Sequence, residues 1–158
     1  MVRLDVLMLA VLAGASGCDG FRAPTVSVMD VTLIDATEEA LALSFVMDLA
    51  NPNTAAVPLA EFRYTLAIDG KEVYAGRRGG GVTLSAMDSR QVFLPAIVPY
   101  RALGWTLQTL PASVDYTLTG RLQYHAPTRL TQVLFDTGTR RPKVPFSARG
   151  RLQIRASD

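Results

Sequence analysis

The side chains that most often carry out chemistry in proteins are scarce in this sequence. Its 158 residues include one Cys and one His, too few for an internal disulfide, a Cys-rich zinc site or a centre built from several histidines. His125 has no second His, Cys or clustered carboxylate at ligand spacing, which favours a surface or capping role. No Ser lies in a nucleophile elbow, and no carboxylate pair has an assignable acid–base role. We therefore expect no enzymatic activity, no metal and no cofactor.

Two other segments carry groups that bind ions in other proteins. Arg77-Arg78-Gly79-Gly80-Gly81 lacks the Gly-Lys-Ser/Thr ending and the following helix of a phosphate loop, so a mobile hairpin loop is predicted. Asp35, Glu38 and Glu39 flank a turn, but without the spaced ligands and Gly of a calcium loop. A solvated turn is favoured there over weak Ca²⁺ binding.

The lone Cys follows a short apolar leader. Arg3 precedes an eight-residue apolar run over residues 6–13, and Gly14-Ala15-Ser16-Gly17 leads to Cys18. This layout is typical of a secretory signal, and the run is far shorter than the ~20 apolar residues of a spanning helix. The small residues before Cys18 resemble a bacterial lipobox, although Ala15 stands where Leu is usual. The alternative is an ordinary signal peptide followed by a free thiol.

These features predict how the chain is anchored. We expect residues 1–17 to be a lipoprotein signal peptide and Cys18 to be the site of lipid attachment. Attachment by more than one acyl chain is lasting, since each buried CH₂ contributes ~0.8 kcal/mol. The protein would then be a membrane-anchored lipoprotein of the bacterial cell envelope, facing the periplasm, with the inner or outer membrane left open.

The rest of the chain has the composition and periodicity of a folded β domain. A hydrophobic content of 49% with a net charge of +2 excludes a disordered polyelectrolyte. Residues 41–49 alternate apolar and polar side chains, and residues 62–68 do the same, which predicts two half-buried strands. Asp69-Gly70 predicts a type I′ hairpin turn. Folding there places Leu66 opposite Val73 and Tyr64 opposite Ala75.

Further strands are predicted over residues 26–35, 90–98, 114–124 and 144–155. A change of apolar parity indicates a bulge near Asp30, and Pro95 favours an edge strand or an irregularity. Pro99 and Pro111 bracket one short helix, whose apolar residues recur at helical spacing from Tyr100 to Leu110. We therefore predict an all-β fold with one short helix: a two-sheet antiparallel β-sandwich.

Several motifs in these strands resemble one known family. They are Asn51-Pro52-Asn53, Val57-Pro58-Leu59, the segment 62–66, Asp69-Gly70, and Val144-Pro145-Phe146 with Gly150. Together they are similar to the late-embryogenesis-abundant type 2 family, also called the water-stress-and-hypersensitive-response (WHy) domain, from about Pro24 to Ile154. The resemblance implies an immunoglobulin- or fibronectin-III-like sandwich, without enzymatic activity, associated with desiccation and other stress. Bacterial members are often exported lipoproteins. Residues 18–25 would be the lipidated Cys and its tether, and residues 26–155 the domain.

The family motif has a structural interpretation that needs no ligand. Its members here are Asn51, Pro52, Asn53, Tyr64, Asp69 and Gly70. Pro52 forces the preceding residue into an extended backbone, and both Asn side chains can bond to nearby backbone groups. A fold-defining turn is favoured over a binding site.

Charge is divided unevenly along the chain. Residues 18–76 hold three basic and nine acidic side chains, whereas residues 121–158 hold eight basic and two acidic ones. Arg149, Arg151 and Arg155 share one face of the last strand, and Arg121 points away from the apolar set of its own strand. Such a face could contact anionic lipid headgroups, at ~1 kcal/mol per basic residue. Ion pairing with the acidic early strands is favoured instead.

Three classes of function follow. The leading one is a non-enzymatic, membrane-tethered protein that protects envelope proteins or membranes during water loss, through weak contacts with client proteins. The second is an envelope adaptor or scaffold that binds one protein partner by strand addition at a sheet edge. An enzyme is the third and least favoured. No nucleic-acid partner is expected, and the oligomeric state is left open.

Overall fold

The computed structural model describes residues 20–126 and 141–154. The elements in chain order are β1 (Thr25–Ala36), β2 (Ala40–Ala50), β3 (Val57–Ile68), β4 (Lys71–Gly79), β5 (Thr83–Leu84), β6 (Ser89–Pro99), α1 (Tyr100–Leu103), a 3₁₀ turn η1 (Leu107–Thr109), β7 (Ser113–Tyr124) and β8 (Lys143–Gln153). Cys18 and Arg155 lie outside the described residues.

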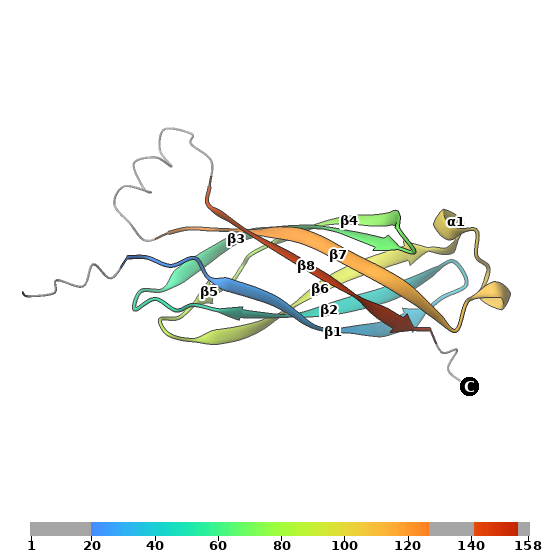
Figure 1. Cartoon of the computed structure of the whole chain (residues 1–158), viewed down its shortest axis with the longest axis horizontal. Helices are drawn as coiled ribbons and strands as arrows, with labels where there is room; N and C mark the ends of the chain where they lie inside the picture. Colours follow the sequence, from blue (N-terminus) through green and yellow to red (C-terminus); the bar gives the residue numbers. More distant parts are fainter. Residues whose placement is uncertain (1–19, 127–140, 155–158) are drawn as a thin grey trace, which may run out of the picture.

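The strands form two antiparallel sheets packed face to face (Figure 1). One sheet has three strands in the order β1-β2-β6. The other has the order β4-β3-β7-β8, and the short β5 pairs with the start of β3. In immunoglobulin lettering these are an A-B-E sheet and a C′-C-F-G sheet. The predicted all-β sandwich with one short helix is confirmed.

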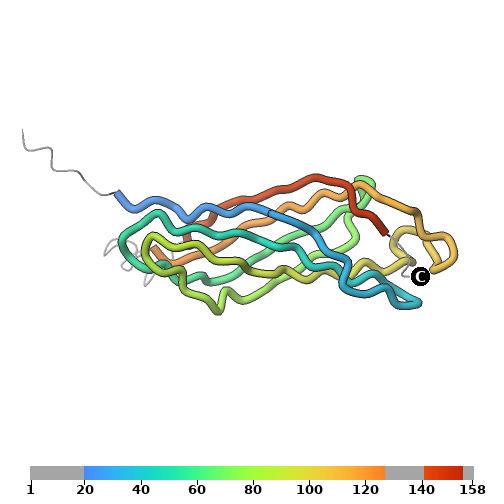
Figure 2. Tube along the Cα trace, turned by 90° about the horizontal axis from the view of Figure 1, so that it is seen from below, coloured from blue at the N-terminus to red at the C-terminus, as the bar shows by residue number. Residues whose placement is uncertain are grey.

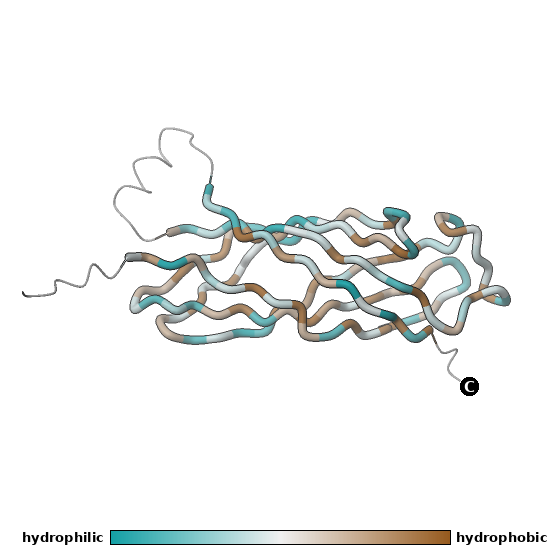
Figure 3. Tube along the Cα trace, viewed as in Figure 1, coloured by the Kyte–Doolittle hydropathy of each residue, from teal (hydrophilic) through white to brown (hydrophobic). Residues whose placement is uncertain are grey.

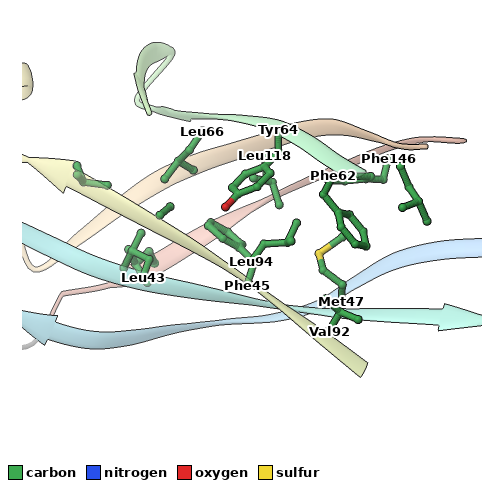
Figure 4. Packing of buried hydrophobic residues seen from close by; sticks show 14 of the residues in the cluster. Leu43, Phe45, Met47, Phe62, Tyr64, Leu66, Val92, Leu94, Leu118 and Phe146 are labelled. Carbon is green, nitrogen blue, oxygen red and sulfur yellow. The ribbon is translucent and has the colours of Figure 1, made fainter. Parts of the chain in front are cut away.

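The core lies between the sheets and follows from the alternation along each strand. In β2 the residues at every second position, from Leu41 to Leu49, are buried, and their neighbours are half-buried. β3 and β6 alternate buried and more exposed residues in a similar way, and Figure 3 shows hydrophobic and hydrophilic residues interspersed along the strands. Phe45, Met47 and Leu94 of the three-stranded sheet meet Phe62 and Leu118 of the other sheet (Figure 4).

β1 is irregular at two places. The register against β2 shifts between Val28 and Asp30 and again between Leu33 and Asp35. Met29 and Ile34 are therefore bulged, and both are largely exposed. The first bulge confirms the prediction from apolar parity, and the second was not predicted. Two bulges also discourage strand addition at this edge of the sheet.

The β3–β4 hairpin turns where predicted, but its register was predicted wrongly. Asp69 and Gly70 have φ of 48° and 81°, as both central residues of a type I′ turn require. The register shifts beyond Leu66, which pairs with Tyr74. Val73 is thus an extra residue on β4, and every pairing beyond it moves by one position.

β4 also continues through Arg77 and Arg78 to Gly79, so the predicted loop over residues 77–81 begins too early. β3 starts at Val57, well before the alternating segment that predicted it. The two-residue β5 was not predicted. Pro95 does lie on an edge strand, as predicted, since β6 ends the order of its sheet.

The helix is shorter than its apolar spacing predicted. α1 ends at Leu103 because Gly104 takes a left-handed backbone, with φ of 71°, and η1 follows as a separate turn. Pro99 precedes the helix at its N-cap position, one residue earlier than predicted. Within the described residues, no helix is long and apolar enough to cross a membrane.

The segment before β1 is packed against the sandwich. Phe21 is half-buried beside the core and stacks on Tyr124, with ring centroids 5.9 Å apart, and Pro24 is buried. The predicted tether over residues 18–25 is therefore wrong from Phe21 onward. This segment enters at one end of an elongated domain, and β8 ends at the other (Figure 2).

Candidate functional site

Asn51 has the one buried polar side chain in the described part of the chain, at 2% exposure. Its amide nitrogen donates to the carbonyl oxygens of Ala55, Leu84 and Ser85, at 2.8, 3.3 and 2.8 Å. Its amide oxygen accepts from the backbone N–H of Asn53 at 3.0 Å and from the Asn53 side chain at 2.8 Å. One side chain thus ties the β2–β3 connection to the segment after β5.

Asn53 extends this network to the chain's N-terminal side. Its side-chain oxygen accepts from the backbone N–H of Arg22, and its side-chain nitrogen donates to the Arg22 carbonyl, both at 2.8 Å. Two parallel bonds of this kind hold a backbone as a neighbouring strand would. The Asn-Pro-Asn segment therefore fixes the stretch that carries Phe21.

The other members of the motif have positions inside the fold. The Tyr64 hydroxyl donates to the carbonyl oxygen of Pro95 and so bridges the two sheets. Burial raises the pKa of Tyr64 above its ordinary value of 10. Asp69 accepts from the backbone N–H of Asp115 at 3.1 Å, which joins the hairpin turn to the start of β7.

The predicted pairing of early acidic with late basic side chains is found at Glu61, whose pKa is lowered by the hydrogen bond from Arg63 and also by the charge of Arg141. The carboxylates of β1 and β2 belong to the three-stranded sheet, whereas β7 and β8 belong to the other sheet. The ion pairs among the described residues join Glu61 to Arg63 and Arg77, and Asp115 to Arg151. Each of them lies within the five-stranded sheet.

The predicted basic face is not one continuous patch. Arg151 bonds to Asp115 at 3.0 Å, which raises the pKa of its guanidinium, and Arg149 lies opposite Thr117. Arg121 lies opposite Pro145, four positions from Arg149 along β8 and therefore ~13 Å away. Arg121, Arg149 and Arg151 are exposed, but the fold does not gather them.

Arg121 instead has two basic neighbours that sequence analysis missed. Arg63 of β3 lies directly between Arg77 of β4 and Arg121 of β7, in one row across three strands. The row borders a shallow groove of about 580 Å³, whose other lining residues are Tyr64, Thr65, Ala75, Gly76, Thr119 and Gly120. The bulge at Val73 creates this row, since the predicted register would turn Arg77 toward the core.

A larger cleft, of about 800 Å³, lies at the helical end of the sandwich. Ile97, Trp105 and Leu107 give it apolar walls, and Glu38 and Glu39 an acidic one. The expectation of a solvated turn over residues 35–39 agrees with the exposure of its side chains. No group of three metal-ligating side chains occurs within residues 20–126 and 141–154.

His125 belongs to no metal-ligating group among the described residues. It follows β7, where its backbone N–H donates to the carbonyl oxygen of Pro58 at 2.9 Å. Elsewhere, burial raises the pKa of Tyr100, Tyr116 and Tyr124. A hydrogen bond from Arg63 lowers the pKa of Glu61 below 4.5. Each of these pKa shifts follows from burial or from a neighbouring charge. The features that the described residues form are surfaces and grooves suited to binding.

Comparison with known proteins agrees with this architecture. Residues 46–150, more than half of the chain, match the family model LEA_2, described as "Late embryogenesis abundant protein". The chain belongs to this family. The family assignment predicted from the Asn-Pro-Asn and Asp-Gly motifs is thus confirmed, and membership supports a role related to stress and desiccation.

Two plant relatives illustrate the likeness. The chain is 29% identical to the "Probable desiccation-related protein LEA14" of Arabidopsis thaliana over 131 residues, which cover 83% of this chain and 82% of the relative. It is 26% identical to the "Late embryogenesis abundant protein Lea14-A" of Gossypium hirsutum over 99 residues, covering 61% and 66%. A solution structure of an Arabidopsis thaliana protein has the same fold, with a TM-score of 0.66 and 22% identity over 88% of this chain and 87% of that one.

Proposed function

We propose that this protein is a non-enzymatic lipoprotein of the bacterial cell envelope, anchored through Cys18, that protects envelope proteins or membranes during desiccation or other stress. The observation that carries the protective role is the family match over residues 46–150. The proposed anchor rests on the sequence around Cys18, the small residues before it and the apolar leader.

The packed N-terminal segment limits how far the folded domain can lie from a lipid on Cys18. Phe21 is three positions after Cys18 in the sequence, a reach of ~10 Å, and Phe21 is stacked on Tyr124. A lipid on Cys18 would hold the end of the sandwich that carries the Asn51–Asn53 network close to the bilayer surface. The exposed outer face of the three-stranded sheet would stay open to the periplasm.

The outer face of the three-stranded sheet carries a surface suited to weak contact with client proteins. Phe93 and Ile97 are 52% and 53% exposed and lie on the outer side of β6, opposite Val46 and Ala42 of β2. Proteins that lose water expose apolar surface, and exposed apolar side chains on a rigid sheet would cover it transiently. This surface would supply the protective contacts.

The anchor is tested by mass spectrometry of the mature protein from envelope membranes. We expect an N-terminus at Cys18 that carries a diacylglycerol thioether. Cleavage elsewhere, or an unmodified thiol at Cys18, would refute the anchored form and leave the family role intact.

Protection is tested by drying lactate dehydrogenase with the full chain and measuring the activity recovered on rehydration. An equal mass of serum albumin is the reference. The double variant Phe93→Ser/Ile97→Ser should lose most of the excess protection. Met87→Ser is the matched control, because Met87 is 70% exposed but lies outside β6. Equal loss in both variants would contradict the assignment of the surface.

The same surface favours a second candidate, an envelope adaptor that binds one partner at the edge strand β6. Exposed apolar side chains on an edge strand are characteristic of partner-binding sheets. A single partner recovered in stoichiometric amount by pull-down, together with protection no better than that of albumin, would favour the adaptor.

A further inference from the structure

The three arginines of β4, β3 and β7 form an arrangement that sheets normally avoid. Arg63 faces Arg77 on one neighbouring strand and Arg121 on the other. Adjacent strands are ~4.8 Å apart, and like charges directly opposite one another destabilise a sheet. Where a fold keeps such a conflict, a functional reason is the usual explanation.

Glu61 relieves the conflict only in part. It lies two residues before Arg63 on the same outer face of β3, bonds to Arg63, and bonds to the Arg77 Nε at 3.0 Å. In the part of the chain that the structure describes, no ion pair involves Arg121. Arg141 also acts electrostatically on Glu61. This one carboxylate therefore faces at least three guanidiniums, and the row keeps a net positive charge.

The groove beside the row supplies space and further donors. Thr65 and Thr119 lie opposite one another in the next row of the outer face, with Ala75 beside Thr65. The groove between these short side chains and the guanidiniums, about 580 Å³, is large enough for a phosphate group. A guanidinium presents a planar fork of N–H donors that matches phosphate oxygens, and the Thr hydroxyls supply two more donors.

We propose that Arg63, Arg77 and Arg121, with Thr65 and Thr119, form a binding site for a phosphate group. The ligand is either a small phosphorylated molecule or the phosphate of an anionic lipid headgroup. Both present negatively charged, non-bridging phosphate oxygens to the groove. The site consists of described residues alone and does not depend on the proposed anchor or on the stress role.

The test uses the full chain with Cys18→Ser, titrated with inorganic pyrophosphate at constant ionic strength. The readout is the amide NMR signals of Gly76 and Gly120, which line the groove, and the signal of Gly104 at the far end is the internal reference. We expect saturable shifts of Gly76 and Gly120 and none of Gly104. Acetate at the same concentration should give no saturable shift.

Variants separate a built site from general charge attraction. Arg121→Gln should weaken pyrophosphate binding about tenfold, because a hydrogen bond between charged groups is lost. Arg90→Gln is the matched control: it removes the same charge from an exposed position on β6, in the other sheet. Arg90→Gln should change the affinity for pyrophosphate by less than about twofold. Since Arg121 has no carboxylate partner among residues 20–126 and 141–154, Arg121→Gln should also leave the melting temperature unchanged or raised.

Vesicles distinguish the two sources of phosphate. The fraction of protein that floats is measured with phosphatidylglycerol vesicles and with phosphatidylcholine vesicles. The difference between the two fractions is compared for the parent chain and for Arg121→Gln. A difference that the substitution removes identifies a lipid headgroup, and saturable pyrophosphate binding without that difference identifies a soluble phosphate compound. If neither probe responds to Arg121→Gln, or if Arg90→Gln weakens binding equally, the proposal is refuted.

Discussion

Replacement of Asn51 by Ala tests whether the family motif is a structural element. The substitution removes two amide N–H donors, which three carbonyl oxygens share, and two accepted hydrogen bonds from a site that is 2% exposed. The carbonyls of Ala55 and Ser85 belong to exposed residues and can be hydrated, whereas the carbonyl of Leu84 belongs to a buried one. Hydration of the Ala55 and Ser85 carbonyls offsets the loss of the bonds to them, so about three bonds remain uncompensated. At ~1 kcal/mol per uncompensated bond, the free energy of unfolding should fall by about 3 kcal/mol.

The measurement is urea unfolding followed by far-UV circular dichroism. We expect a lower midpoint at an unchanged slope, and a melting temperature lower by about 10 °C. Thr54→Ala is the control, because Thr54 is an exposed neighbour, and it should stay within about 0.5 kcal/mol.

Asn51→Asp adds a pH test at the same position. A carboxylate has no proton for the three carbonyl oxygens, so Asp should destabilise more than Ala at neutral pH. Burial among carbonyls raises the pKa of the new carboxyl above ~3.9 in the folded state. The folded protein then binds the proton more tightly than the unfolded chain, so the deficit should shrink as the pH falls through the raised pKa. A loss under 1 kcal/mol in Asn51→Ala, or a pH-independent deficit in Asn51→Asp, would refute the structural interpretation and favour a binding role.

Two further predictions concern the interior of the five-stranded sheet. Gly120→Ala should cost about 2–3 kcal/mol, because an added Cβ would lie 2.4 Å from the Phe146 ring; Gly79→Ala, with open space around it, should be nearly neutral in the same thermal unfolding assay. Tyr64→Phe should cost about 1 kcal/mol at neutral pH through loss of the bond to Pro95. Because burial raises the pKa of Tyr64 above 10, the associated stability is present below pH 10 and declines above it, so urea midpoints near pH 11 should fall less in Tyr64→Phe than in the parent chain. A parallel decline in both proteins would show that Tyr64 is not the group responsible.

Local patterns predicted most of the secondary structure because alternation and turn chemistry are local properties. The two-residue period of β2 follows from a strand with one buried face, and Asp69-Gly70 predicts its turn from backbone sterics alone. The helix was predicted too long because apolar spacing continues past Gly104. A left-handed Gly ends a helix whatever periodicity follows it.

The docked N-terminal segment could not be predicted in the same way. Gly20 to Pro24 has no strand period, and what holds it is the Asn53 side chain, which is 31 positions from Arg22 along the chain. Side-chain bonds to an irregular backbone depend on which loops the fold brings together. The prediction of a free tether failed for this reason.

The sequence by itself determined the sandwich, the family and the scarcity of catalytic groups, since these depend on composition, alternation and short motifs. Tertiary structure alone decided where the charges meet. The separation of β1 and β2 from β7 and β8 into different sheets removes cross-strand pairing between them, and the early carboxylate Glu61 of β3 bonds to Arg63 and Arg77 within its own sheet. The bulge at Val73 turns Arg77 outward beside Arg63 and Arg121, because a shift of one residue moves a side chain to the opposite face of a sheet.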